Sequence, residues 1–342
     1  MNWSRVRWLL IVCLCLADLV LGVLLWRDYR GENTVSHAAI EDAAALLAEV
    51  NVTLPPEVVP TAVIRDYVYR VPVSEDAYRA AFSAMTGAEV SGVYLLPGSS
   101  GMSLLFENGD RAEYYHNLYL TYTRGDGDSA VYASVVEAYT EAPGTTGYAE
   151  AGGKAASAAA EAAQLFLSAL TSGGTEAVSL RPRLQTVRRT PQEGVYLAVF
   201  CEEIVYRGSR RSAADLYDTV MYVLTEGETV LYLSGTWVPF LPDEVYSIRK
   251  LDQLNILFSE RTRHQTNGIS GDAAQAFVSD HTAAGCTMTS MQRLYYMLWD
   301  DAGTLYLRPA WLMGYDIPQE DGDTIRRKIL CDGVTGNVVR QD

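Results

Sequence analysis

The feature that most constrains this chain is an apolar stretch near its amino terminus, from Trp8 to Trp26. The stretch is 19 residues long and reads WLLIVCLCLADLVLGVLLW, with Arg5 and Arg7 before it and Arg27 after it. At a rise of about 1.5 Å per residue, a helix of this length covers roughly 28 Å, close to the hydrocarbon thickness of a bilayer. The sequence therefore predicts a transmembrane helix over residues 8–26, with the rest of the chain working while tethered to a membrane.

Two other interpretations of the stretch are weaker. A cleaved signal peptide needs a short apolar core and small residues before the cut, but apolar residues 23–26 directly follow the only candidate, Val20-Leu21-Gly22. A lipoprotein signal needs a small residue before the lipidated cysteine, and neither Cys13 nor Cys15 has one. A retained anchor is favoured, with tryptophans near both membrane interfaces.

The usual orientation for one span after a short basic terminus predicts that residues 1–7 are cytoplasmic. Residues 27–35 then form a juxtamembrane linker, and the remainder lies outside the cytoplasm at the cell membrane. The formal net charge of the chain is −15, which argues against nucleic acid as a partner, because no cluster of basic residues could neutralise phosphates. The expected contact with the lipid bilayer is the span itself.

Beyond the span, the pattern of apolar residues predicts helices alternating with antiparallel strands. Helices are expected from Ser36, from Ser74 to Gly87, over 154–171 and over 272–283. Strands are expected over 61–70, 89–96, 103–107, 111–123, 195–206, 217–225, 229–238, 287–299, 304–314, 324–330 and 337–340. The predicted fold class is α+β, with one ectodomain over 36–145 and a second over 152–342, separated by the Gly-rich segment 142–153.

No pattern typical of catalysis or of cofactor binding occurs in the chain. The sequence lacks a P-loop and a GxGxxG motif, and Gly98-Ser99-Ser100-Gly101 does not have the spacing of a nucleophile elbow. His281 with Asp280 and Cys286 matches no zinc pattern. Adjacent acidic pairs, such as Glu202-Glu203, are expected on opposite faces of a strand or in solvent. The sequence thus predicts a protein that is not an enzyme, with no catalytic residue, cofactor or metal.

The ectodomain contains three cysteines, Cys201, Cys286 and Cys331, and no CxxC pair. One disulfide with a free thiol and three buried thiols are both open, and the second is favoured.

The sharpest candidate for a functional contact is Asp18, in the middle of the span. An ionisable residue at that depth costs a few kcal/mol unless it is paired or faces another helix. Because the chain offers only one span, Asp18 predicts a partner helix, with the small residues Cys15 and Gly22 as further candidate contacts. A protonated residue that is merely tolerated is the alternative.

Four short segments together resemble the YycI family, part of the YycH/YycI group of regulators in low-GC Gram-positive bacteria. They are Met1-Asn2-Trp3-Ser4-Arg5 running into the span, Asn51-Val52-Thr53-Leu54-Pro55 after the first helix, Leu307-Arg308-Pro309-Ala310-Trp311, and the closing hairpin over 330–336. The middle of the chain is similar to the family in architecture only.

The resemblance implies a non-enzymatic accessory protein with a cytoplasmic amino terminus, one membrane helix and an extracellular α+β domain. It implies two partners, a sensor histidine kinase of a cell-wall two-component system and a YycH-like membrane protein. Family members are described as tuning that kinase, whereas the strongly acidic, Arg-biased composition of this chain leaves the sign of its regulation open. The alternative is an anchored extracytoplasmic ligand- or peptide-binding module without a kinase partner.

Overall fold

The computed structural model describes residues 34–62, 67–125, 127–142, 147–170, 178–206, 212–239, 243–247, 252–265, 285–319 and 321–341. The chain divides into two compact units, and each is assembled from separated parts of the sequence. The central unit comprises Tyr67–Ser247 and Arg293–Pro309. The terminal unit comprises Met1–Asp66, Ile248–Gln292 and Ala310–Asp342.

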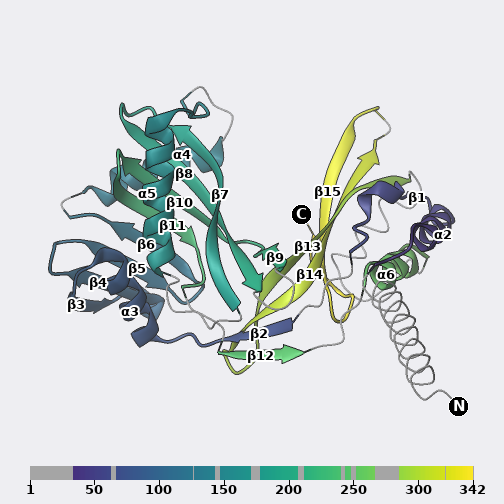
Figure 1. Cartoon of the computed structure of the whole chain (residues 1–342), viewed down its shortest axis with the longest axis horizontal. Helices are drawn as coiled ribbons and strands as arrows, with labels where there is room; N and C mark the ends of the chain where they lie inside the picture. Colours follow the sequence, from purple (N-terminus) through teal and green to yellow (C-terminus); the bar gives the residue numbers. More distant parts are fainter. Residues whose placement is uncertain are drawn as a thin grey trace, which may run out of the picture. The chain divides into compact units, whose positions relative to one another are not determined.

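The described residues form a mixed α+β structure with two sheets, as the sequence predicts (Figure 1). The α-helices are α2 (His37–Ala48), α3 (Glu75–Thr86), α4 (Ser129–Glu141), α5 (Lys154–Leu170) and α6 (Gln253–Gln265). The strands up to β8 are β1 (Val52–Thr53), β2 (Tyr67–Val71), β3 (Val90–Leu95), β4 (Gly101–Phe106), β5 (Arg111–Tyr115), β6 (Tyr119–Thr123), β7 (Val178–Arg189) and β8 (Val195–Tyr206). The later strands are β9 (Ser212–Asp215), β10 (Val220–Glu226), β11 (Thr229–Thr236), β12 (Glu244–Ser247), β13 (Cys286–Trp299), β14 (Leu305–Pro318), β15 (Thr324–Asp332) and β16 (Val338–Gln341).

The central unit is organised around an antiparallel sheet in the order β3-β4-β5-β6-β11-β10-β8-β7, with β9 paired to β8. Because side chains alternate along a strand, each strand feeds two separate cores. On β8, Ala198 and Phe200 pack in the core shared with α3 and α5, whereas Leu197 and Val199 pack in the core shared with α4. Helices α3 and α5 therefore cover one face of this sheet, and α4 covers the other (Figure 1).

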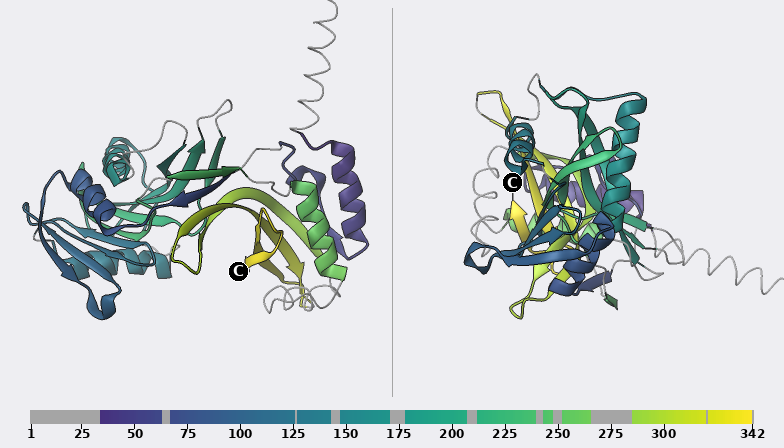
Figure 2. Two further views of the ribbon diagram at one scale, coloured as in Figure 1. Left: turned by 90° about the horizontal axis from the view of Figure 1, so that it is seen from below. Right: turned by 90° about the vertical axis from the view of Figure 1, so that its left-hand side faces the viewer.

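The terminal unit has its own core, which gathers segments that are far apart in the sequence. Strand β1 pairs in parallel with β13, and β15 pairs with β14 and with β16. Helices α2 and α6 lie side by side against this sheet, as Figures 1 and 2 show. Ile40 of α2, Leu257 of α6 and Met313 of β14 are almost fully buried in the shared core. Strands β13 and β14 each contribute residues to both units.

Helices α2 and α3 begin where their predicted caps lie. The hydroxyl of Ser36 accepts a hydrogen bond from the N–H of Ala39 at 3.2 Å, and the hydroxyl of Ser74 accepts one from the N–H of Ala77 at 3.2 Å. These contacts satisfy amide groups that the first turn of a helix leaves unpaired. Gly87 ends α3 in the left-handed conformation, with φ of 67°. Both helices are therefore confirmed.

One predicted strand differs from the structure. The predicted single strand over 111–123 is instead the hairpin β5–β6, because a turn over 116–118 puts Leu118 at φ of 66°. The strands at 195–206, 229–238 and 287–299 are confirmed within a few residues. Helices α4 and α6 and strand β7 were not predicted from the sequence, and the helix predicted over 272–283 lies outside the described residues.

The structure divides the ectodomain differently from the predicted pair 36–145 and 152–342. Strand β6 pairs with β11 over five residues, from Tyr119 opposite Thr236 to Thr123 opposite Tyr232. The predicted boundary therefore lies within the central unit, where one sheet continues across it. Backbone pairing between distant strands leaves no signal in local composition. For this reason the glycine-rich segment 142–153 predicts a domain boundary, although the sheet continues across it.

Candidate functional site

The contact candidates predicted in the membrane span, Asp18, Cys15 and Gly22, lie outside the residues that the structure describes. The same is true of residues 8–26 and of most of the linker 27–35. Among the helices that the structure describes, none combines the length and apolarity needed to cross a bilayer. The span and its contacts therefore stay predictions.

Among the residues that the structure describes, the histidines and paired carboxylates lie in separate places. His37 lies on the exposed surface of α2, His116 directly follows β5, and His281 is outside the described residues. Glu202 and Glu203 are neighbours on β8, so their side chains leave opposite faces of the sheet. Within the described ranges, no group of three or more His, Cys, Asp or Glu side chains could hold a metal ion.

The three cysteines are buried free thiols, which confirms the favoured of the two predicted states. Burial raises the pKa of the Cys201 thiol, and it raises that of Cys286 to about 11. The Sγ of Cys331 lies 3.8 Å from Oε1 of Glu260 inside the core of the terminal unit. Burial that raises the pKa of a thiol makes it a poor nucleophile, so Cys201 and Cys286 serve packing.

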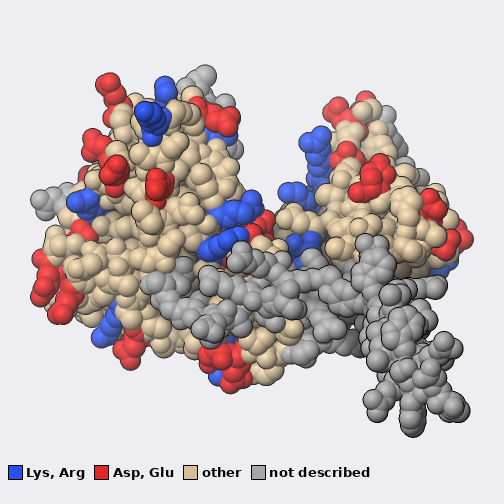
Figure 3. Space-filling model, in the orientation of Figure 1, with Lys and Arg blue, Asp and Glu red and all other residues tan. Residues whose placement is uncertain are grey.

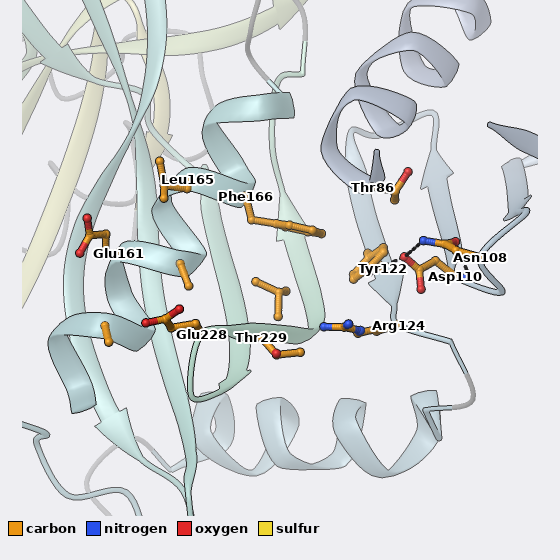
Figure 4. Close-up of a pocket in the computed structure, with 13 residues that line it drawn as sticks. Thr86, Asn108, Asp110, Tyr122, Arg124, Glu161, Leu165, Phe166, Glu228 and Thr229 are labelled. Carbon is orange, nitrogen blue, oxygen red and sulfur yellow. Dashed lines mark hydrogen bonds between the residues drawn. The ribbon is translucent and has the colours of Figure 1, made fainter. Parts of the chain in front are cut away.

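A cavity of about 600 Å³ opens on the face of the central unit that carries α5 (Figure 4). Its wall is formed by one side of α5, the β4–β5 turn, the end of β6, and the turn between β10 and β11. The charged lining residues are Asp110, Arg124, Glu161 and Glu228. This volume is in the range of small-molecule sites, roughly 300–1,000 Å³.

Asp110 is the fixed polar group of the cavity, and only 5% of its surface is exposed. Its Oδ2 accepts hydrogen bonds from the hydroxyl of Tyr122 and from Nδ2 of Asn108, both at 2.8 Å. Its Oδ1 accepts one from the N–H of Gly125, also at 2.8 Å. Burial, together with the hydrogen bond to Asp110, raises the pKa of Tyr122, so the phenol keeps its proton and donates. Asp110 thus ties the β4–β5 turn to the end of β6.

The other three charged groups of the cavity are separated, with the negative side chains on one side and the positive side chain on the other. In Figure 4, Glu161 and Glu228 lie on one side of the cavity and Arg124 lies on the other, with Thr229 and Phe166 between them. All three charged side chains are exposed, and they form no hydrogen bond or ion pair with the parts of the chain that the structure describes. Their charges are therefore available to a ligand.

The rim of the cavity also has an apolar part. Leu165 on α5 exposes 67% of its surface, which is high for a large apolar side chain. Its neighbour Phe166 is half-buried, and its ring lies 5.0 Å from that of Tyr122, centroid to centroid. An exposed leucine beside an aromatic ring offers apolar surface to whatever enters.

Strand β3 forms a second unusual surface, at the end of the nine-stranded sheet. It pairs with β4, and no strand that the structure describes pairs with its other edge. Its residues, VSGVYL, carry no charge, and the exposed fractions of Val93, Tyr94 and Leu95 are 38%, 59% and 74%. Soluble proteins usually protect such an edge with charges, prolines or a cover, since it can pair with another chain. Figure 3 shows wide uncharged areas between the acidic side chains on the visible face of this unit.

The sequence predicts three pieces of the cavity separately, namely the turn at Asn108-Gly109-Asp110, the helix over 154–171, and the turn at Glu226-Gly227-Glu228. Their meeting depends on the pairing of β6 with β11 and on the packing of α5, neither of which has a local signal. The sequence shows that β3 is uncharged and largely apolar, but it does not predict that β3 lies at the edge of the sheet.

Comparison with known proteins assigns no family. No protein-family model matches the chain, and no curated protein matches it. One similar solved structure is the crystal structure of an uncharacterized protein from Eubacterium rectale ATCC 33656. The TM-score is 0.42 and the sequence identity 14%, over 82% of this chain and 87% of the other. A likeness this coarse carries no functional argument, so membership of the YycI family stays a prediction.

Proposed function

We propose that this protein is a membrane-anchored accessory regulator of a two-component sensor histidine kinase that controls cell-wall metabolism. The regulator is not an enzyme, its amino terminus is cytoplasmic, and its two α+β units lie outside the cell membrane. It contacts the kinase and a YycH-like membrane protein through the helix over 8–26 and through the ectodomain. The kinase, the second partner and the location are taken from the resemblance to the YycI family.

The observation that carries the ectodomain part of the proposal is the open edge of β3. An extended segment of a partner protein can add to such an edge as a further strand, with backbone hydrogen bonds for affinity and side-chain contacts for specificity. Tyr94 and Leu95 provide exposed apolar contacts on that strand. Because β3 has no charge, it places no repulsive carboxylate against the partner strand.

A regulator of this kind can bias a kinase only if it binds one signalling state more tightly than the other. We expect that difference to arise at Asp18 and at the linker over 27–35, next to the membrane. The experiment is a pull-down of the full-length, tagged chain from membranes, together with a reporter of kinase output. Asp18→Leu and Val93→Lys are each expected to reduce recovery of the kinase and to change its output.

Val131→Lys is the matched control for the edge substitution. Val131 lies on α4 of the same unit and exposes 45% of its surface, close to the 38% of Val93, but it is not on a sheet edge. The proposal fails if Asp18→Leu leaves both kinase recovery and kinase output unchanged. If Val93→Lys behaves like Val131→Lys, β3 is not the contact in the ectodomain.

The alternative function is an anchored module that binds a ligand or peptide without a kinase partner. The cavity beside α5 is the observation that favours it. Deleting residues 8–26 separates the two functions, because a binding module keeps its ligand without the span, whereas a regulator that acts through the membrane loses its partner.

A further inference from the structure

The cavity beside α5 has the features of a binding site that is independent of any protein partner. Its polar end is rigid, because the Asp110 carboxylate is held by Tyr122, Asn108 and Gly125 and has little remaining capacity to bind a ligand. The groups left to bind are Glu161, Glu228 and Arg124, which are exposed around the opening. Rigid polar groups in the same cavity as unpaired, exposed charged groups are typical of a preformed site.

The separation of charges determines what fits. Two carboxylates on one side attract an ammonium group, and charge-assisted hydrogen bonds of that kind are about twice as strong as neutral ones. The Arg124 guanidinium on the other side matches a carboxylate, to which arginine can donate two parallel hydrogen bonds. A phosphate-rich ligand such as a nucleotide is disfavoured, because Glu161 and Glu228 would repel it.

The apolar rim indicates what lies between the two charged ends. Leu165 and Phe166 both project from α5, and Figure 4 shows Phe166 between the glutamates and Arg124. A ligand with an apolar side chain between its charged ends would remove the exposed surface of Leu165 from water, which is favourable. The cavity volume of about 600 Å³ is large enough for a few amino-acid residues.

We propose that this cavity binds a short peptide with free termini, whose ammonium group lies against Glu161 and Glu228 and whose carboxylate lies against Arg124. An apolar side chain of the peptide covers Leu165 and Phe166. This inference goes beyond contact with a kinase, and it does not depend on the proposed regulatory function.

The test is isothermal titration of the full-length chain, purified in an uncharged detergent, with alanyl-leucyl-alanine as the probe. We expect saturable binding of the peptide with free termini. Acetylating its amino group or amidating its carboxyl group is expected to weaken binding about tenfold, because each change removes one charge-assisted contact.

Variants assign the two ends of the peptide. Arg124→Gln is expected to bind the free and amidated peptides equally, and the double variant Glu161→Gln/Glu228→Gln is expected to bind the free and acetylated peptides equally. Leu165→Ala should weaken binding of all three. Glu226→Gln is the matched control, since Glu226 is an exposed glutamate of the same turn as Glu228 but does not line the cavity.

The proposal is overturned if the free peptide does not bind saturably, if blocking its termini has no effect, or if the cavity variants behave like Glu226→Gln. Because the purified chain is titrated without any partner, failure here leaves the regulatory proposal standing. Equally, loss of kinase recovery by Asp18→Leu does not affect this result.

Discussion

Glu202 is a carboxyl in an environment that its residue type rarely occupies. None of its surface is exposed, and it lies on β8 in the core of the central unit. Its Oε2 accepts a hydrogen bond from the N–H of Val238 at 2.9 Å, and its Oε1 makes none with a described residue. Burial raises the pKa of this carboxyl well above its ordinary value. The folded protein therefore keeps a proton on Glu202 at pH values above the ordinary pKa of a glutamate, where the unfolded chain has released it.

This proton predicts a pH dependence of stability whose sign follows from linkage. Above the ordinary pKa of a glutamate, the folded state binds more protons than the unfolded state, so stability falls as pH rises towards the raised pKa of Glu202. The loss from one such proton is up to about 1.4 kcal/mol per pH unit. Glutamine does not titrate, so the stability of Glu202→Gln should lack this fall. The stability of the variant minus that of the wild type should therefore increase as pH rises from 5 to 8, as measured by urea unfolding followed by tryptophan fluorescence.

A second variant separates the proton from the hydrogen bond. Glu202→Leu also lacks the titration, but it leaves the N–H of Val238 unpaired, which costs about 1–3 kcal/mol at every pH. If the difference between Glu202→Gln and the wild type does not change with pH, Glu202 is ionised in the folded protein and the core must contain a partner for it.

The sequence predicted the faces of this acidic pair but not the burial. Alternation along a strand puts Glu202 and Glu203 on opposite sides, and the structure confirms this, with Glu203 paired to Arg181 at 2.7 Å. A fully buried glutamate cannot be read from the sequence, because the side chain type favours the surface. Its burial depends on the N–H of Val238, which is 36 residues away.

At the scale of elements, α2, α3 and α5 were predicted, whereas α4 and α6 were not. Both missed helices nevertheless begin at an aspartate cap, because Asp128 accepts from the N–H of Ala130 and Asp252 accepts from the N–H of Asn255. Helix α4 fully buries only Val136 among its 13 residues, although Tyr132, Val135 and Tyr139 recur at helical spacing and pack half-buried on the same core, so its apolar pattern was overlooked rather than absent. Strand β7 lies at the end of its sheet and contains Pro182, which an edge strand tolerates but which argues against a central one. Its many polar residues therefore resembled a loop.

The cap of α3 gives a prediction at this scale. Ser74→Ala removes the hydroxyl that accepts from the N–H of Ala77, and it should destabilise the protein by about 1 kcal/mol in urea unfolding. Ser74→Asp keeps a side-chain acceptor and should stay close to the wild type. Ser83→Ala, in the same helix but away from its start, is the control and should change stability by less than about 0.5 kcal/mol. Equal effects of Ser74→Ala and Ser83→Ala would show that the cap contributes nothing.

For the whole molecule, sequence order was a poor guide to which parts fold together. The terminal unit takes segments from three places in the chain, and the central unit takes two. The core of the terminal unit contains Val52 near one end of the chain and Cys331 near the other. The cavity beside α5 is also made by distant segments, so the same lack of a local signal hid both the units and the site. Pairing between distant strands is fixed by the fit of whole surfaces, which no local window of sequence contains.

The division into units therefore predicts what happens when the chain is cut at the glycine-rich segment. A fragment over 36–145 keeps β3 to β6 but loses β11, the partner of β6, and also loses α5, which covers the sheet face that carries Leu120 and Tyr122. A fragment over 152–342 loses α2 and β1 from the terminal unit. We expect neither fragment alone to unfold cooperatively in urea, whereas the uncut fragment over 34–342 should do so. A cooperative transition in the isolated 36–145 fragment would contradict the shared sheet, because it would show that β6 does not need β11.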